Sequence, residues 1–437
     1  MTERRVVITG LGAVTPLGNN VKDTWRSLCA GRSGVARISL FNAESFPTRI
    51  AGEVKDFNFP ADACLPPACR TGRDRQALMA GRHSLFALEA ADEAMKDSGL
   101  EESQIRPERL GIYFGAGDGG FDFSEYASIL SESINGDESR VSPELYFKNS
   151  VTRMNSKTVL EQEPFQAIHH LSETFSAKGP VSNCLTACAA SSQAIGEGAW
   201  LIRKGQAEVM ITGGAHSMIH PLGVAGFNLL TALSTQNNTP ERASRPFDKN
   251  RDGFVLSEGA GVLILEELEH ARSRRAKIYA ELAGYGVTAD AFRLTDPHPE
   301  GRGAIQAMRL SLQDARLRPE EIDYINAHGT STQLNDQIET QAVKEVFKEK
   351  AKGIPTSSIK SMLGHMIAAA GAVELIASVL TIRNGLIPPT INYEFPDKAC
   401  DLDYVPNKAR EKKVETVLSN SFGFGGQNIA LIVKKYA

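Results

Sequence analysis

Residues 179–196 read Gly179-Pro-Val-Ser-Asn-Cys-Leu-Thr-Ala-Cys-Ala-Ala-Ser-Ser-Gln-Ala-Ile-Gly196. After the Gly-Pro pair, which punctuates a loop, Val181 to Leu185 are enough for a short strand. From Ala187 onward the small residues predict a helix that continues to about Lys204, where Gly205 ends it. A strand that passes directly into a helix is the repeating unit of α/β proteins, and it sets the interpretation of the remaining chain.

Cys188 lies at the predicted junction of this strand and helix. Free backbone N–H groups and the helix dipole favour an anion there, so we expect a lowered thiol pKa and a reactive thiolate. The small neighbours Ala187 and Ala189 leave room for a substrate carbonyl. A buried, inert cysteine is the alternative, and it is the commoner fate of a free cysteine. Cys184, still within the strand, is assigned to packing.

Composition restricts the class of protein. The 437 residues are 42% hydrophobic and 23% charged, with a formal net charge of −4. This balance is ordinary for a soluble globular protein and argues against a general nucleic-acid binder. We find no apolar run of membrane-spanning length and no signal-peptide pattern, so we expect a cytoplasmic protein. The six cysteines suggest neither a disulfide framework nor a zinc site.

The second half of the sequence repeats the order of the first. A predicted helix at 87–97, an acidic turn and a strand at 112–114 correspond to a helix at 304–315, an acidic turn and a strand at 324–325. This indicates an internal duplication, with halves at 1–270 and 271–437. Strands alternate with helices throughout, which predicts parallel or mixed sheets covered by helices.

Local patterns predict further elements. Gly10 to Thr15 follows a buried strand and resembles the start of a dinucleotide fingerprint, but Thr15 replaces the third glycine, so we predict a tight turn instead. Residues 20–30 and 76–98 predict helices that end at Gly31 and Gly99. Residues 141–178 are polar and hard to assign, with a helix near their end.

Four features of the second half carry chemically capable groups near predicted strand ends. They are His328 on a Gly-flanked turn, Lys360 with His365, Glu374 on the following helix, and the glycine-rich loop at 419–426. Singly, each has a structural explanation: a core or capping histidine, a structural ion pair, or a tight turn. Together with Cys188 they are the parts of an acyl-transfer site.

The motifs in combination resemble the β-ketoacyl-[acyl-carrier-protein] synthases, most closely the type II elongating enzymes of fatty acid synthesis. The stretches that carry the resemblance are 186–188, 232–235, 243–248, 251–255, 326–332, 360–365, 388–392 and 420–426. The resemblance covers nearly the whole chain. It implies a thiolase-like fold of two duplicated α/β halves in five layers, αβαβα, and usually a homodimer.

The resemblance also implies a role for each residue at the nucleophile. Cys188 would attack the thioester of an acyl-carrier protein and hold the acyl chain. The backbone N–H groups of Cys188 and Phe424 would form an oxyanion hole. Phe424 would be a gate that swings to admit malonate, a movement that Gly423, Gly425 and Gly426 permit.

The remaining roles concern the malonyl substrate. His328 and His365 would bind the malonyl thioester carbonyl through neutral Nε2–H groups and stabilise the enolate. Lys360, paired with Glu374, would order the two histidines. The pantetheine arm would hydrogen-bond to Thr330 and Thr332. No metal or diffusible cofactor is expected, because the thioester and the loss of CO₂ supply the driving force.

Partner surfaces are less defined. The carrier protein of this family is acidic, and the basic run Arg70, Arg73 and Arg75 is a candidate contact for it; a solvated charged face is the alternative. Residues 141–178, which lie near the dimer interface and acyl pocket in the family, depart from its usual pattern.

Three other interpretations share parts of the pattern. Stretches 333–336, 357–360 and 401–406 also resemble catalytic ketosynthase subunits of type II polyketide or polyene synthases, which would work as a heterodimer with a chain-length factor. A non-catalytic chain-length factor is disfavoured because it lacks the nucleophile. A biosynthetic thiolase is disfavoured because it has a second cysteine where this chain has 422–426.

Overall fold

The strand order of the main sheet repeats between the two parts of the chain. The computed structural model describes residues 4–59, 80–117, 123–134 and 140–436, and in these ranges ten strands form one sheet. The first five are, in spatial order, β5 (Val181–Cys184), β4 (Leu110–Ala116), β6 (Val209–His216), β7 (Gly259–Glu267) and β1 (Val6–Val14). The next five, from the opposite edge, are β10 (Thr356–Ser357), β9 (Tyr324–Asn326), β13 (Thr416–Gly423), β14 (Gln427–Lys434) and β8 (Ala280–Ala289). When the five strands of each set are numbered in chain order, both sets have the spatial order third, second, fourth, fifth, first. A repeated strand order is expected for a duplication.

The two sets of strands meet at their first members. β1 and β8 pair antiparallel through Val7 with Glu281 and Ile8 with Ala280. Within each set the first three strands in spatial order run parallel, and the other pairs are antiparallel. The parallel strands of each set therefore end at a common edge, which is where loops of an α/β sheet bring functional side chains together.

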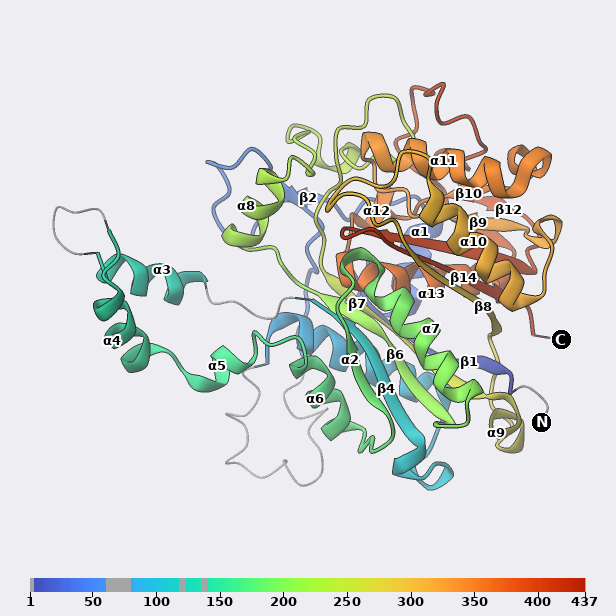
Figure 1. Ribbon diagram of the computed structural model, residues 1–437, viewed down its shortest axis with the longest axis horizontal. Helices are drawn as coiled ribbons and strands as arrows, with labels where there is room; N and C mark the ends of the chain where they lie inside the picture. The colour runs from blue at the N-terminus through green and yellow to red at the C-terminus, as the bar shows by residue number, and fades with distance from the viewer. Residues whose placement is uncertain (1–3, 60–79, 118–122, 135–139, 437) are drawn as a thin grey trace.

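Helices separate and cover the two sets of strands (Figure 1). In the middle, α7 (Ala190–Arg203) packs on β4 and β6, α13 (Ala370–Asn384) packs on β7 and β13, and the two helices contact each other. On the outside, α2 (Arg82–Ser98) covers β1 and β7, and α10 (Arg302–Ala315) covers β8 and β14 beside α11 (Gln333–Phe347). The arrangement has the five predicted layers. The apolar segment Ile367–Asn384 is long enough to cross a membrane, but 89% of it is buried here, so its composition is that of a core helix.

Gly10 and Gly12 do not form the predicted turn. β1 continues through both of them to Val14. A Cβ atom on Gly12 would lie 1.8 Å from the carbonyl oxygen of Ala90, and one on Gly10 would lie 2.1 Å from that of Ala94. The prediction of a turn was wrong because these glycines serve close packing of α2 on the strand, which a single sequence does not distinguish from turn formation.

Other expected elements are present with shifted ends. α1 (Val21–Cys29) starts at Asn20, whose side-chain oxygen accepts from the N–H of Asp23 at 2.8 Å. The described part of the predicted helix at 76–98 begins at Arg82 and ends at Gly99, which is left-handed with φ 61°. The shorter elements are β2 (Ala36–Arg37), β3 (Ile50–Ala51), α8 (Pro221–Leu229), α9 (Leu268–Ser273), α12 (Lys360–Leu363), β11 (Leu386–Ile387) and β12 (Arg410–Glu411).

An arm extends away from the main body before β5 (Figure 1). It consists of α3 (Phe123–Glu132), α4 (Pro143–Arg153) and α5 (Ser156–Leu160), and α6 (Gln166–Thr174) then returns the chain to the sheet. The hard-to-assign stretch 141–178 is thus mostly helical. On α4, Phe147 is 70% exposed and Val151 is 68% exposed.

Candidate active site

Cys188 lies in a short 3-10 turn, Ala187–Ala189, between β5 and α7. Ala187 adopts a left-handed conformation with φ 46°, so the chain turns sharply just before the cysteine. A non-glycine residue held in this region costs free energy and is common at functional sites. The Cys188 side chain is only 5% exposed. The predicted position between strand and helix start is therefore correct, and the turn aims the thiol into the interior.

The backbone N–H groups of Phe424 and of Cys188 itself lie close enough to the Cys188 thiol to favour its thiolate form and to act to lower its pKa. They are the two groups to which the family resemblance gives the role of an oxyanion hole. Burial nevertheless raises the thiol pKa to about 11, although both N–H groups and the charge of Lys360 act to lower it. The expectation of a lowered pKa was wrong, because desolvation of a buried thiolate outweighs the helix-terminal field.

The glycine-rich loop between β13 and β14 approaches Cys188 closely. A Cβ atom on Gly423 would lie 3.3 Å from the backbone nitrogen of Cys188 and 3.0 Å from the carbonyl oxygen of Thr186. Gly425 and Gly426 are left-handed, with φ 83° and 76°. Glycine at these positions allows the loop to bring the Phe424 N–H to the sulfur.

His328 and His365 face each other beside the cysteine. Their ring centroids are 5.5 Å apart, the ring planes are inclined at 83°, and each side chain is 2% exposed. Burial, and then the nearby charge of Lys360, hold both imidazole pKa values well below their ordinary range. Both rings are therefore neutral at pH 7. The ring nitrogens of His365 have no hydrogen-bond partner among the described residues, so they are available to a substrate.

Lys360 and Glu374 form the predicted ion pair, and it is buried. The Lys360 ammonium contacts Glu374 Oε1 and donates to the carbonyl oxygen of His328 at 2.8 Å. It also lies 3.3 Å from Nδ1 of His328. A lysine ammonium has only donors, so Nδ1 must accept and the ring proton resides on Nε2. The pair thus sets the tautomer that an Nε2–H donor requires.

Glu339 is a site residue that sequence reasoning missed. This buried carboxylate on α11 accepts the backbone N–H groups of His328 and Gly329, both at 2.8 Å, and the side-chain amide of Asn420 at 3.1 Å. Burial raises its pKa to about 7. The sequence did contain a signal for this role, because Glu339 falls on the inner face of the helix that follows the turn with His328.

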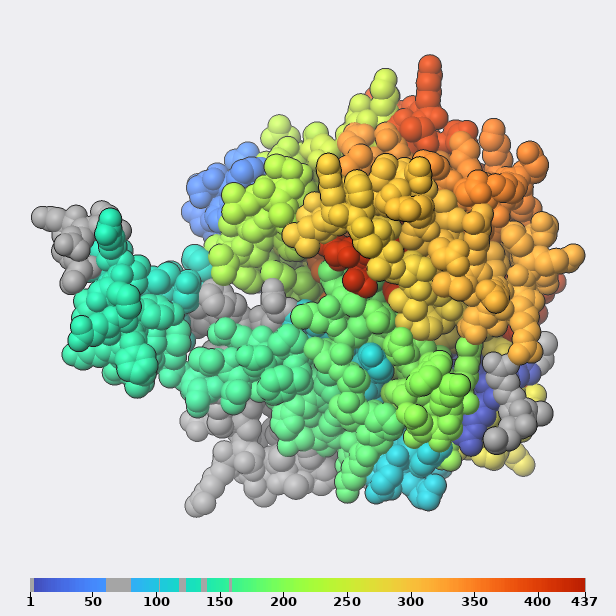
Figure 2. All heavy atoms as spheres, viewed as in Figure 1, coloured from blue at the N-terminus to red at the C-terminus, as the bar shows by residue number. Residues whose placement is uncertain are grey.

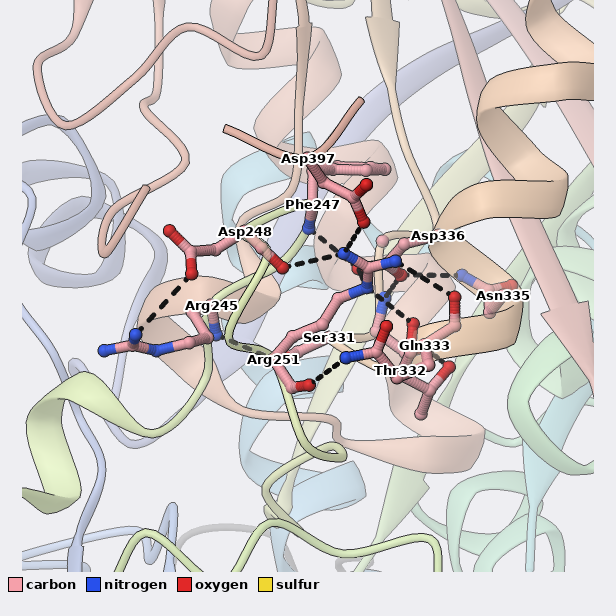
Figure 3. A network of polar contacts seen from close by, with 12 residues as sticks. Arg245, Phe247, Asp248, Arg251, Ser331, Thr332, Gln333, Asn335, Asp336 and Asp397 are labelled. Carbon is pink, nitrogen blue, oxygen red and sulfur yellow. Dashed lines mark hydrogen bonds and ion pairs between the residues drawn. The ribbon is translucent and has the colours of Figure 1, made fainter. Parts of the chain in front are cut away.

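Thr330 and Thr332 have hydroxyl groups 3.0 Å apart. Their loop is fixed by the fully buried Arg251, which donates to the carbonyl oxygens of Thr332 and Gln333 and pairs with Asp397 (Figure 3). Asp336 accepts the N–H of Thr330 at 3.0 Å. This network holds both threonines in one wall of the site.

A cavity of about 290 Å³ joins these groups. Cys188, His328, His365, Phe424 and the two threonines Thr330 and Thr332 all line it. Figure 2 shows a hollow on this face, with red atoms of the C-terminal region visible between gold and green surfaces. Larger, more open grooves elsewhere on the surface contain none of these reactive groups.

Some predicted features lie elsewhere. Arg70, Arg73 and Arg75 fall outside the described residues. Cys184 is buried at the end of β5, 3.3 Å from the Thr186 hydroxyl, in agreement with its packing assignment. Within the described ranges, no group of three or more His, Cys, Asp or Glu side chains could hold a metal ion.

Comparisons with known proteins agree with this geometry. The family model "Beta-ketoacyl synthase, N-terminal domain" matches residues 3–271, and "Beta-ketoacyl synthase, C-terminal domain" matches residues 279–394. The chain is 46% identical to "3-oxoacyl-[acyl-carrier-protein] synthase 2" of Coxiella burnetii, covering 100% of this chain and 99% of that one. The protein of the same name from Synechocystis is 43% identical, with 100% and 99% coverage.

Solved structures show the same likeness. A β-ketoacyl synthase from Burkholderia phymatum superposes with a TM-score of 0.87 at 35% identity, covering 99% of this chain and all of that one. A type II polyketide ketosynthase in complex with its acyl-carrier protein, AntDE:AntF, gives a TM-score of 0.86 at 35% identity, with full coverage of both chains. The chain therefore belongs to the β-ketoacyl synthase family, and its fold is the thiolase-like fold of ketosynthases.

The buried ion pair predicts a characteristic stability pattern. Lys360→Met or Glu374→Leu alone leaves an unpaired buried charge and should lower the free energy of unfolding by about 3–5 kcal/mol. The double variant Lys360→Met/Glu374→Leu should recover most of this loss. Denaturation in urea measures all three. Lys344→Met, which removes an exposed pair with Asp401, is the control and should cost less than about 1 kcal/mol. Equal small losses in every variant would contradict a buried pair.

The raised thiol pKa predicts a steep pH dependence of alkylation. Below the pKa, the thiolate fraction of Cys188 grows about tenfold per pH unit, so its reaction with iodoacetamide should accelerate continuously between about pH 6.5 and about pH 9.5. The rate is followed by peptide mass spectrometry. The Cys188→Ala variant shows how much alkylation occurs at other residues. A rate that levels off near or below about pH 8 would show a thiol activated in the free enzyme.

Proposed function

We propose that this protein catalyses the decarboxylating condensation of malonyl-acyl-carrier protein with an acyl chain held as a thioester on Cys188. The product is a 3-oxoacyl-acyl-carrier protein, as in fatty acid elongation. The observation that carries the proposal is the convergence of two N–H groups on the Cys188 sulfur, in a cavity that also holds two neutral histidines. Relatives over the full length named 3-oxoacyl-[acyl-carrier-protein] synthase 2 support the substrate class.

In the first half-reaction the Cys188 thiol attacks the acyl thioester carbonyl. The sulfur–carbon bond forms, and negative charge on the carbonyl oxygen is stabilised by the N–H groups of Cys188 and Phe424. The bond to the carrier thiol then breaks. Because the Cys188 pKa is about 11, its proton must leave during attack, and it ends on the departing carrier thiol.

In the second half-reaction the malonyl thioester carbonyl accepts hydrogen bonds from His328 and His365. Neutral imidazole donors stabilise the enolate that forms when the carboxylate leaves as CO₂. The enolate carbon attacks the acyl thioester on Cys188, and the thiolate that leaves takes up a proton. In total, one acyl-enzyme, one malonyl thioester and one proton are consumed. One 3-oxoacyl thioester, one CO₂ and the free thiol are formed. No metal or diffusible cofactor takes part.

A second pathway uses the same chemistry. The structural likeness to the AntDE:AntF complex at 35% identity supports a catalytic ketosynthase subunit of a type II polyketide or polyene synthase. The relatives at 41–46% identity named 3-oxoacyl-[acyl-carrier-protein] synthase 2 favour fatty acid elongation. Activity on saturated acyl chains without any second subunit distinguishes the two. A cytoplasmic site of action is part of the proposal, supported by the unexceptional soluble composition.

The proposed enzyme works as a homodimer, with a chain-length-factor heterodimer as the alternative. Two exposed features support a second subunit. One is the α3–α5 arm with Phe147 and Val151, and the other is β5, which pairs with β4 but has no strand on its outer edge among the described residues, and where Val181 is 45% exposed. Sedimentation of the purified protein should give a dimer mass. Phe147→Ser/Val151→Ser should weaken the dimer by about tenfold or more, because apolar burial is lost. A stable monomer before mutation would contradict the homodimer.

The acylation step provides the direct test of the function. Incubation with acyl-acyl-carrier protein should add one acyl group to the native enzyme, seen by intact-protein mass spectrometry and assigned to Cys188 by peptide mapping. Cys184→Ala is the matched control and should acylate normally, while Cys188→Ala should not acylate at all. An adduct on another residue, or none, would refute the proposal.

A further inference from the structure

His216, the last residue of β6, is a buried side chain that the proposed reaction does not use. It is 2% exposed, and among the described residues neither of its ring nitrogens has a hydrogen-bond partner. Burial, followed by the neighbouring His83 and His220, lowers its pKa to about 3, so the ring is neutral at pH 7. A neutral imidazole has one N–H donor and one acceptor nitrogen, and leaving both unpaired away from water costs free energy. An orphaned group of this kind calls for a physical explanation.

The strand register places His216 on the face of the sheet that packs against the start of α7. β4 and β6 run parallel, with Gly115 beside Gly214. Cβ atoms on these two glycines would lie 2.6 Å from the backbone nitrogen of Ser191 and 2.8 Å from its Cβ atom, respectively. Since side chains alternate along a strand, His216 is the next residue of β6 on this face. It therefore lies one step nearer the carboxyl edge of the sheet, where Cys188 precedes α7.

Two further observations place the ring beside the reacting groups. A Cβ atom on Gly117, at the end of β4, would lie 3.3 Å from Nδ1 of His216. Because residue 117 is a glycine, it puts no side chain against this edge of the ring. His216 is also close enough to His365 to act, after burial and Lys360, to lower the pKa of that imidazole.

Three of the apolar residues around Cys188 belong to the segment that His216 begins. Ile219 and Val224 are buried in one cluster with the cysteine, and Phe227 packs against that cluster. An acyl chain on the sulfur has to lie among such side chains, because the open cavity has to admit the pantetheine arm and then the malonyl group. In these surroundings an alkyl chain leaves the His216 nitrogens unpaired, whereas an oxygen atom on the chain can pair with one of them.

We propose that His216 recognises an oxygen atom on the acyl chain held by Cys188, so that the enzyme prefers chains with a hydroxyl or carbonyl group near the thioester to plain alkyl chains. The inference rests on the proposed function and narrows its acyl substrate, while the condensation itself is unchanged. A site whose buried polar group needs a partner discriminates against the analogue that lacks one. Such an oxygen remains on a chain whose 3-oxo group was not fully reduced after an earlier condensation. The reaction that supplies this substrate therefore stops short of complete reduction.

The test measures the rate of Cys188 acylation by decanoyl-, 3-hydroxydecanoyl- and 5-hydroxydecanoyl-acyl-carrier protein, using intact-protein mass spectrometry. In the native enzyme at least one hydroxylated chain should react about tenfold faster than decanoyl, because it pairs with the ring. His216→Leu and the smaller His216→Ala should both reduce this ratio to less than about twofold without lowering the decanoyl rate.

Two further variants separate recognition from a structural role. His216→Gln keeps a donor and an acceptor and should retain most of the preference. His169→Leu, at an exposed histidine of α6, is the matched control and should leave the ratio unchanged. Since His216→Leu removes unpaired polar atoms from the interior, its midpoint of unfolding in urea should be no lower than that of the native protein.

Each other outcome overturns the inference. Equal rates for all three chains in the native enzyme would mean that a buried water, rather than the substrate, pairs with the ring. A preference that survives in His216→Leu and His216→Ala assigns recognition of the oxygen to another residue. Equal losses on every chain show damage to the nucleophile turn. If no chain acylates Cys188 in the native enzyme, the proposed function fails, and the inference fails with it.

Discussion

The site depends on one ammonium group held away from water. Lys360 is 2% exposed, and its charge is balanced by Glu374 and by the carbonyl oxygen of His328. Burying a charge is costly unless it is paired and hydrogen-bonded, so these contacts define a single arrangement of three chain segments. The same ammonium fixes the His328 tautomer and, together with burial as the larger cause, lowers the pKa values of both histidines. One buried charge thus links stability to the protonation states needed for catalysis.

Duplication explains how such a site can be divided between two parts of the chain. Each central helix follows a 3-10 turn, whose first residue is left-handed: Ala187 before α7 and Ile367 before α13. The first turn contains the nucleophile, and Lys360 and His365 lie just before the second turn. The glycine-rich loop then crosses between the parts and delivers the Phe424 N–H to Cys188. Neither half contains a complete acyl-transfer site.

Much of this could be predicted from sequence because the reactive residues follow strands directly. Cys188, His328 and the Lys360–Glu374 pair occupy the expected positions. Three features depend on tertiary contacts that no local pattern reveals. The Cys188 pKa is set by burial among residues distant in sequence, Gly10 and Gly12 are explained by the approach of α2, and Glu339 acts across a turn from α11.

The central claim is that Cys188 and the two neutral histidines perform one condensation in one cavity. Its most direct measurement is a single turnover: acyl-enzyme isolated on Cys188 is mixed with malonyl-acyl-carrier protein, and CO₂ and protein products are quantified together. The account predicts one CO₂ and one 3-oxoacyl-acyl-carrier protein for each acyl-enzyme consumed. Hydrolysis of the acyl-enzyme with malonyl-acyl-carrier protein left intact would contradict it.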